Sequence, residues 1–171
     1  MTWKELIGKQ APSVTLSNYD GESYTITPGK DGLPIALFFF PKAFTYGCTR
    51  EACQFRDALA EREVFKDERA VVIGVSPDSV ATQKSFVEKE KLTYPVLSDE
   101  KFEARDAFKV GKGMFGLADY ARTTFIIDGK GVVRDVMDAT INYGGHSKFV
   151  TKWLEKLQKE KGQEAPAAES K

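Results

Sequence analysis

The chain contains only two cysteines, Cys48 and Cys53, and they lie five residues apart, shortly after the apolar run Ile35 to Phe40. The apolar run predicts a buried strand, and the pattern from Thr49 onward predicts a helix. A thiol at the start of a helix faces unpaired backbone N–H groups and a partial positive charge, which favour its thiolate form. The pair therefore predicts a nucleophilic thiol that can attack an electrophile at neutral pH.

The spacing of the two cysteines indicates how they could react with each other. In an intact helix, residues five apart have Cα atoms about 8.6 Å apart, whereas a disulfide needs roughly 4.4 to 6.8 Å. Cys48 and Cys53 can therefore join only after the helix unwinds locally. This suits a cycle in which one thiol is oxidised and the other resolves it. A metal site, a static disulfide or two ordinary core cysteines fit less well, and a thiol–disulfide exchanger more often has two intervening residues.

Composition excludes several classes of function. Lys plus Arg and Asp plus Glu each total 25, so the formal net charge is zero and a nucleic-acid partner is not expected. No apolar run approaches the roughly 18 to 20 residues that span a bilayer, so no membrane partner is expected. The N-terminal residues resemble neither a signal nor a transit peptide, which predicts a cytoplasmic protein, with the nucleus as a further location. A metal site has little support, because the single histidine, His146, lies far along the chain from the cysteines. No cofactor is expected.

Strand and helix patterns alternate along the chain, with a hairpin near each end. The predicted strands cover residues 13–18, 23–27, 35–40, 70–75, 94–97, 123–127 and 132–137, and the predicted helices 49–66, 80–91, 101–108 and 145–161. The alternation predicts an α/β fold with a central mixed sheet flanked by helices. We expect one domain over residues 1–161 and a disordered tail over residues 162–171.

Several motifs together carry a family resemblance that covers most of residues 5 to 158. They are Phe39 to Asp57 (with Pro41, Thr45, Cys48, Glu51, Cys53, Phe55, Arg56 and Asp57), Ile73 to Asp78, Tyr94 to Asp99 and Arg122 to Asp128. In this order they resemble the atypical two-cysteine peroxiredoxins of the Q type, also known as bacterioferritin comigratory protein-like thiol peroxidases. The resemblance implies a thioredoxin-like fold with an N-terminal β-hairpin extension. One departure is Tyr46, which stands where the family usually has proline.

The resemblance also implies an activity and a role for each site residue. The implied enzyme reduces hydrogen peroxide and organic hydroperoxides, and a thioredoxin-type dithiol recycles it. Cys48 would be the peroxidatic thiolate that becomes a sulfenic acid, and Cys53 would resolve it in an intramolecular disulfide. Thr45 would hydrogen-bond the thiolate and the peroxide, and Pro41 would shield the sulfur from water. Arg122 would hold the thiolate and the polarised peroxide.

Two further residues have less specific expectations, and two other functions stay open. Glu51 is expected in the first turn of its helix, where it complements the dipole and orients Arg122, and His146 is expected to be a cap or surface residue. The alternatives to a peroxidase are a peroxide-responsive redox sensor or holdase that uses the same disulfide switch, and a thiol–disulfide exchanger acting on proteins. We expect a monomer, because resolution within one chain needs no second subunit.

Overall fold

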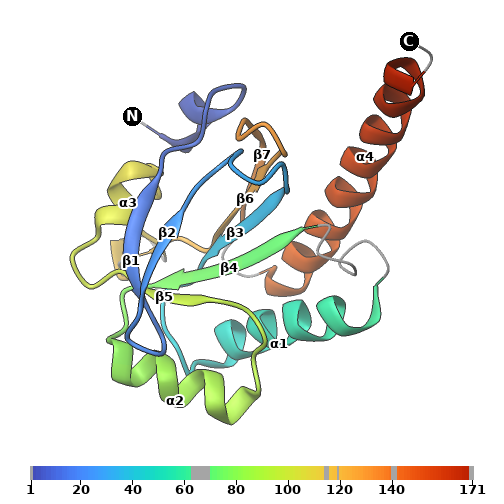
Figure 1. The fold of residues 1–171 in the computed structure, drawn as a ribbon. Helices are drawn as coiled ribbons and strands as arrows, with labels where there is room; N and C mark the ends of the chain where they lie inside the picture. The colour runs from blue at the N-terminus through green and yellow to red at the C-terminus, as the bar shows by residue number, and fades with distance from the viewer. Residues whose placement is uncertain (1, 63–69, 114–115, 119, 140–141, 170–171) are drawn as a thin grey trace.

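A computed structural model describes residues 2–62, 70–113, 116–118, 120–139 and 142–169 of the chain (Figure 1). The strands of these ranges form one seven-stranded sheet in the order β2-β1-β5-β4-β3-β6-β7. They are β1 (Val14–Asn18), β2 (Ser23–Ile26), β3 (Ile35–Phe39), β4 (Val71–Ser76), β5 (Val96–Ser98), β6 (Thr123–Ile127) and β7 (Val133–Asp138). The helices are the 3-10 helix η1 (Trp3–Leu6), α1 (Tyr46–Glu61), α2 (Val80–Glu90), α3 (Glu103–Ala107) and α4 (Tyr143–Glu169).

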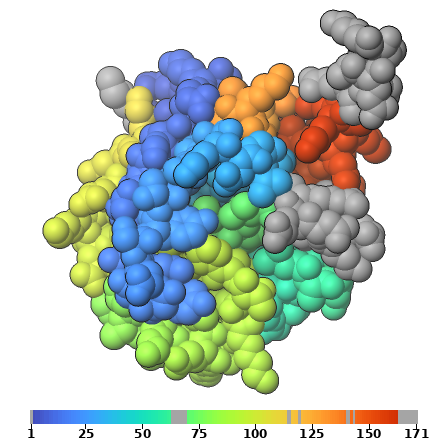
Figure 2. All heavy atoms as spheres, in the orientation of Figure 1, coloured from blue at the N-terminus to red at the C-terminus, as the bar shows by residue number. Residues whose placement is uncertain are grey.

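The sheet is mixed, as the sequence predicts. Strands β3, β4 and β5 are parallel to one another, whereas β6 pairs antiparallel with β3 and with β7. The N-terminal hairpin of β1 and β2 extends the sheet because β1 pairs antiparallel with β5. This hairpin packs closely against the rest of the chain, as the blue segment of Figure 2 shows. The arrangement confirms a central sheet with an N-terminal hairpin extension.

Strand β3 is buried on both faces, which explains its continuous apolar sequence. Ala36 and Phe38 belong to a core that includes residues of α1, α2 and α4. The alternate residues, Leu37 and Phe39, belong to a second core on the opposite face, to which α3 contributes. Successive side chains of a strand point to opposite faces, so β3 lies between two layers of helices. The C-terminal end of this central strand leads directly to the two cysteines.

The bounds of helices α1 and α4 differ most from the predicted ones. Helix α1 begins at Tyr46 rather than near Thr49, and it ends at Glu61; the predicted end near Lys66 lies outside the described residues. Helix α4 contains the predicted helix 145–161 and continues to Glu169, so its C-terminal part extends away from the sheet (Figure 1). The division of the chain at residue 161 stays a prediction. Among the described residues, none of the helices is both long and apolar enough to span a bilayer.

Candidate active site

Cys48 lies at the N-terminal end of α1, the helix that follows strand β3 along the chain. It is the third residue of the helix, and its side chain is buried. Thr45 occupies the N-cap position with extended backbone angles. The N–H groups of the first helical turn have no partner within the helix, so they create a positive potential near the sulfur. The predicted position of this thiol at a helix start is therefore confirmed.

The loop between β3 and α1 is held by the end of the neighbouring strand β4. The backbone N–H of Ala43 donates to Asp78 Oδ2 at 2.8 Å, and the Ser76 hydroxyl donates to the same oxygen at 2.7 Å. Phe44 has a positive φ of 65° and its ring packs against Phe86 at 5.3 Å between centroids. These contacts fix the direction in which α1 leaves the sheet, and with it the position of Cys48.

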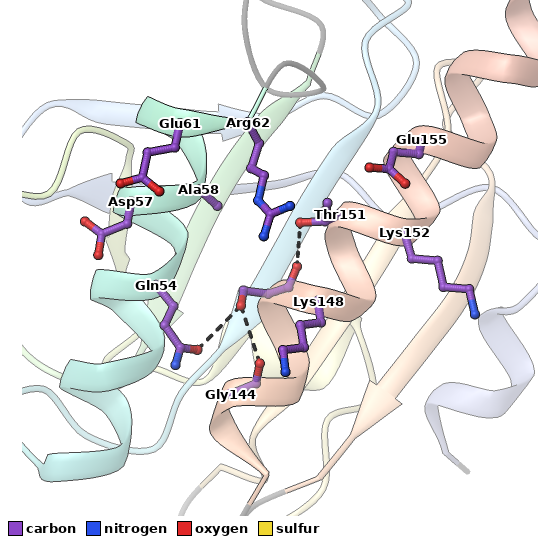
Figure 3. Close-up of a pocket in the computed structure, with 11 residues that line it drawn as sticks. Gln54, Asp57, Ala58, Glu61, Arg62, Gly144, Lys148, Thr151, Lys152 and Glu155 are labelled. Carbon is purple, nitrogen blue, oxygen red and sulfur yellow. Dashed lines mark hydrogen bonds between the residues drawn. The ribbon is translucent and has the colours of Figure 1, made fainter.

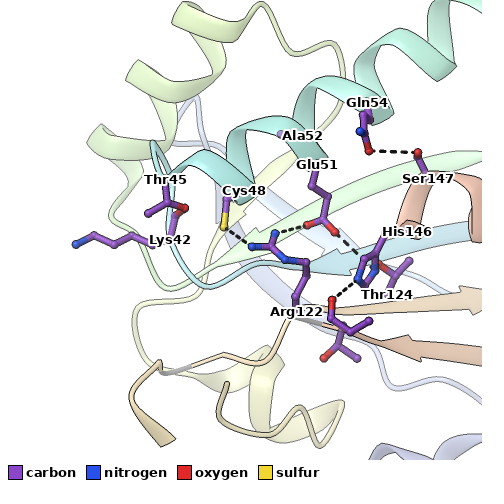
Figure 4. Close-up of polar contacts among 12 residues, drawn as sticks. Lys42, Thr45, Cys48, Glu51, Ala52, Gln54, Arg122, Thr124, His146 and Ser147 are labelled. Carbon is purple, nitrogen blue, oxygen red and sulfur yellow. Dashed lines mark hydrogen bonds and ion pairs between the residues drawn. The ribbon is translucent and has the colours of Figure 1, made fainter. Parts of the chain in front are cut away.

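Arg122 approaches the cysteine from a different part of the chain (Figure 4). Its Nη2 group donates to Cys48 Sγ at 3.4 Å, and its Nη1 group donates to Glu51 Oε1 at 3.1 Å. The guanidinium is buried, and burial disfavours its charge; the interactions with Glu51 and Cys48 outweigh burial and raise the pKa of Arg122. A permanent positive charge therefore lies beside the sulfur. The structure brings together Cys48 and Arg122, two of the residues that the sequence singles out.

The segment before β6 positions Arg122 through close backbone packing. The Ala121 N–H donates to the Gly111 carbonyl at 2.7 Å. Gly113 lies so near this segment that an added Cβ would be 2.5 Å from the Tyr120 carbonyl oxygen, so a larger residue does not fit there. The buried Tyr120 hydroxyl donates to the carboxylate of Asp99. The backbone that carries Arg122 is thus fixed on both sides.

Glu51 is buried beneath Arg122, which corrects the expectation that it occupies the first turn of the helix. Because α1 begins at Tyr46, Glu51 is its sixth residue and has no exposed surface. Burial raises the pKa of the Glu51 carboxyl to about 8, although the charge and hydrogen bond of Arg122 act in the opposite direction. The orientation of Arg122 by Glu51 agrees with the ion pair at 3.1 Å.

His146 is neither a surface residue nor a cap, so that prediction was wrong. Its imidazole is fully buried near the start of α4. Nδ1 lies 2.7 Å from the Thr124 hydroxyl and 3.6 Å from Glu51 Oε2, and Nε2 lies 2.9 Å from the Ala139 carbonyl oxygen. Burial is the main reason that the pKa of His146 is lowered. The site therefore includes a residue that the sequence reasoning assigned to the surface.

Cys53 lies in the same unbroken helix and faces a different environment. Both cysteines are free thiols, and Cys53 is half-buried. Its S–H group donates to Glu90 Oε2, on α2, at 3.4 Å. Burial, followed by the hydrogen bond to Glu90, raises the pKa of the Cys53 thiol to about 11. Cys53 is thus a protonated and weakly nucleophilic thiol in this conformation, as expected if it reacts only after the helix unwinds.

The other predicted site residues lie in the loop that precedes Cys48. The Thr45 hydroxyl donates to the Lys42 carbonyl at 2.7 Å rather than to the sulfur. Pro41 is half-buried at the start of the loop. Tyr46 is the first residue of α1, a position that favours proline in helices in general, and 70% of its surface is exposed. A proline there would rigidify the helix start, and tyrosine replaces that rigidity with an exposed ring.

A groove on the described surface lies away from the sulfur. It has a volume of about 560 Å³ and runs between α1 and α4 (Figure 3). Its lining contains charged residues of both signs, such as Asp57, Arg62, Lys148 and Glu155, but none of the five predicted site residues. The site is instead the buried group of Cys48, Glu51 and Arg122 near the start of α1, which suits a small reactant.

Comparison with known proteins agrees with this geometry. Residues 7–136 match the AhpC/TSA family. The chain is 37% identical over 150 residues to the chloroplastic peroxiredoxin Q of Suaeda salsa, covering 88% of this chain and 68% of the plant protein. Its fold resembles peroxidoxin BcpB from Mycobacterium tuberculosis with a TM-score of 0.72 at 34% identity, covering 89% of this chain and 96% of the other.

Further solved structures extend the likeness. A cysteine-to-serine mutant of PrxQ from Xylella fastidiosa matches with a TM-score of 0.76 at 28% identity, over 90% of this chain and 96% of that protein. The bacterioferritin comigratory protein of Xanthomonas campestris, which has alkyl peroxide reduction activity, matches with a TM-score of 0.72 at 28% identity, over 86% and 91% of the two chains. These matches agree with the buried cysteine beside an arginine. The chain therefore belongs to the AhpC/TSA family and is a peroxiredoxin of the Q type, a thiol peroxidase.

Proposed function

We propose that the enzyme reduces hydrogen peroxide and organic hydroperoxides through a sulfenic acid on Cys48, which Cys53 resolves as an intramolecular disulfide. A thioredoxin-type dithiol then reduces this disulfide. The observation that carries the proposal is the contact of 3.4 Å between Arg122 Nη2 and Cys48 Sγ, at the start of a helix and beside an ion pair with Glu51. A fixed guanidinium in this place stabilises negative charge on sulfur and on the oxygen that leaves.

The first step is the attack of the Cys48 thiolate on one peroxide oxygen. An S–O bond forms, the O–O bond breaks, and the departing oxygen takes a proton to give water or an alcohol. Arg122 holds the charge as it moves from sulfur to oxygen. The Thr45 hydroxyl hydrogen is taken by the Lys42 carbonyl, so the Thr45 oxygen remains as an acceptor for the peroxide O–H group. Pro41, in the same loop, shields the reacting atoms from water.

The second step joins the two cysteines and requires α1 to unwind. The Cys53 sulfur attacks the sulfenic acid, the S–S bond forms, and hydroxide leaves and is protonated to water. Among the contacts that hold α1 in place, the Tyr94 hydroxyl donates to the Ala52 carbonyl at 2.7 Å, and the Cys53 thiol donates to Glu90. Both must break for the sulfurs to reach bonding distance. A dithiol reductant then returns the electrons and restores the helix.

A coupled assay and mass spectrometry test the proposal together. Peroxide consumption with thioredoxin, thioredoxin reductase and NADPH should require Cys48 and be lost in Cys48→Ser. Cys53→Ser should still form a sulfenic acid at Cys48, but should stall and over-oxidise to sulfinic acid. Peptide masses of the oxidised wild type should show Cys48 and Cys53 linked within one molecule. Normal thioredoxin-dependent turnover in Cys53→Ser would exclude Cys53 as the resolving residue.

The same assay separates the peroxidase from the redox sensor or holdase. Unwinding α1 would remove Phe55, fully buried and stacked on Phe38 at 4.6 Å between ring centroids, from the core. Exposed apolar surface of this kind is what a holdase would present to a client. Stoichiometric oxidation that stops after one equivalent of peroxide, with suppression of aggregation of a test protein, would favour the sensor. Sustained turnover favours the enzyme.

A further inference from the structure

A buried polar pair lies behind Arg122, on the side away from Cys48. Glu51, from α1, and His146, from α4, have no exposed surface, and 3.6 Å separates Glu51 Oε2 from His146 Nδ1. Figure 4 shows the two side chains pointing toward each other across the space between the helices. The reaction steps described above use neither the imidazole nor this second carboxyl oxygen. The contact therefore needs an explanation of its own.

The hydrogen bonds around the pair restrict where protons can lie. His146 Nε2 faces the Ala139 carbonyl oxygen at 2.9 Å, and a carbonyl only accepts, so Nε2 carries a proton. Nδ1 has the Thr124 hydroxyl at 2.7 Å, and Glu51 Oε1 accepts from Arg122. Glu51 Oε2 is buried and has no hydrogen-bond partner among the described residues. In a fully deprotonated pair Nδ1 accepts from the Thr124 hydroxyl, and the negatively charged Glu51 Oε2 is buried without a donor from the described residues.

One additional proton removes this conflict in either of two places. On Oε2 it makes the pair a carboxylic acid beside a neutral imidazole, whose Nδ1 accepts from the Thr124 hydroxyl. On Nδ1 it gives an imidazolium beside a carboxylate. Both arrangements have zero net charge, whereas a buried carboxylate that shares its one guanidinium with Cys48 is costly. The proton count is the same in both, so the pair titrates as a unit.

We propose that Glu51 and His146 share one proton at neutral pH, and that this neutral pair is a positioning device that holds Arg122 while leaving its positive charge to Cys48. The sharing of the proton is independent of the chemistry at sulfur. Its effect on Cys48 rests on the function proposed above. Glu51 and His146 are positioning residues, because Arg122 lies between Glu51 and the sulfur.

The charged and titratable groups around the pair agree with this distribution. Arg122, from the segment before β6, and Cys48, from α1, balance each other when the pair is neutral. Asp138, at the end of β7, acts electrostatically on His146, and the buried Tyr94 hydroxyl, between α2 and β5, responds to the charge of Glu51. Burial raises the pKa of Glu51 to about 8 and lowers that of His146, and both directions mean fewer separate charges.

Loss of the shared proton would then weaken the site. A second negative charge would appear next to Arg122 and would compete with the Cys48 thiolate for the guanidinium. We therefore expect the rate constant of Cys48 oxidation by hydrogen peroxide to fall by about three-fold or more as the pair deprotonates, with a midpoint near pH 8. Glu51→Gln cannot lose this proton, so the decline should be absent from its pH profile, whatever its absolute rate.

NMR spectroscopy tests the proton itself, because His146 is the only histidine in the chain. Reduced protein labelled with ¹⁵N in the imidazole and ¹³C in the glutamate carboxyl groups is titrated from about pH 3.5 to pH 9. The ring nitrogens and one carboxyl carbon should change together in a single step near pH 8. Glu51→Gln should abolish the shared step. Glu61→Gln, which changes an exposed glutamate of the same helix, should leave it intact.

Two results would overturn the proposal. Glu51 titrating alone near its ordinary 4.5, with a separate transition of His146 or none, would show that no proton is shared. A shared step without any effect on Cys48 oxidation would keep the pair but remove its role at the sulfur. If Glu51→Gln does not fold, the wild-type titration still decides the first point, and the wild-type pH profile decides the second. If Cys48 proves not to be the peroxidatic residue, the NMR result stands by itself.

Discussion

The hydrogen bond between Cys53 and Glu90 predicts that α2 keeps the resolving thiol unreactive until α1 unwinds. Cys53 donates to Glu90 Oε2 at 3.4 Å, and the guanidinium of Arg56 donates to the Glu90 carbonyl, so the end of α2 is fastened to the second and third turns of α1. The perturbation is Glu90→Gln, which keeps the shape of the side chain and removes its negative charge. The expected result is a more reactive Cys53 in the folded, reduced protein.

The size of the effect follows from the pKa of the thiol. The pKa of Cys53 is raised from an ordinary 9.0 to about 11, and two units correspond to about a 100-fold smaller thiolate fraction below pH 9. Burial is the larger cause and Glu90 the next. Removal of the charge should therefore recover only part of this factor, about three- to ten-fold in thiolate reactivity. Unwinding, which removes both causes, should recover all of it.

Alkylation in a Cys48→Ser background measures this directly, since Cys53 is then the only thiol in the chain. The rate of iodoacetamide modification at pH 8 is followed by intact mass, and far-UV circular dichroism checks that the helices are retained. Glu88→Gln is the matched control, because Glu88 lies in the same helix and is exposed. Equal alkylation rates in Glu90→Gln and in the Cys48→Ser parent would refute the reasoning. So would an increase of the same size in Glu88→Gln.

Three further outcomes follow from the same contacts. With the shared proton proposed above, the folded Glu51–His146 pair stays protonated up to about pH 8, whereas in the unfolded chain glutamate loses its proton above 4.5 and histidine holds one only below 6.5. The folded state thus binds more protons between pH 6.5 and 8, and the free energy of unfolding in urea should fall there by about 2 kcal/mol. Tyr94→Phe removes the buried bond to the Ala52 carbonyl and should destabilise the protein by about 1 kcal/mol, with a several-fold faster Cys48–Cys53 disulfide formation by stopped-flow tryptophan fluorescence. Arg122→Lys, whose single ammonium cannot reproduce both guanidinium contacts, should slow oxidation by hydrogen peroxide about ten-fold or more in single-turnover assays.

The elements of the fold could be predicted because their signals are local. The run Ile35 to Phe40 is apolar throughout because β3 is covered on both faces, and Asp128 to Gly131 marks the turn between β6 and β7 through its glycines and its aspartate. Helix boundaries were less accurate. The N-cap threonine and the glycine before Cys48 did not reveal that the helix already begins at Tyr46, since a tyrosine at the first position carries no start signal.

The contact between Arg122 and Cys48 could not be derived from local patterns, because 74 residues separate them. It depends on the register of the antiparallel pair β3 and β6, in which Phe39 lies opposite Thr123. This register places the residue before Thr123 beside the loop that follows Phe39, and therefore beside the start of α1. Family resemblance supplied the contact in advance, whereas strand and helix periodicities alone contain no information about it.

The buried pair of Glu51 and His146 has a signal in the sequence, because each residue interrupts an apolar stripe of its helix. His146 lies four residues before Val150 and so belongs to the stripe with Leu154 and Leu157 that α4 buries. Glu51 lies three residues after Cys48 and four before Phe55, which places it on the stripe that α1 buries. A titratable residue inside an apolar stripe must be neutralised or paired when the helix packs. Helices α1 and α4 pack against each other, so two such interruptions on facing stripes should have been expected to meet.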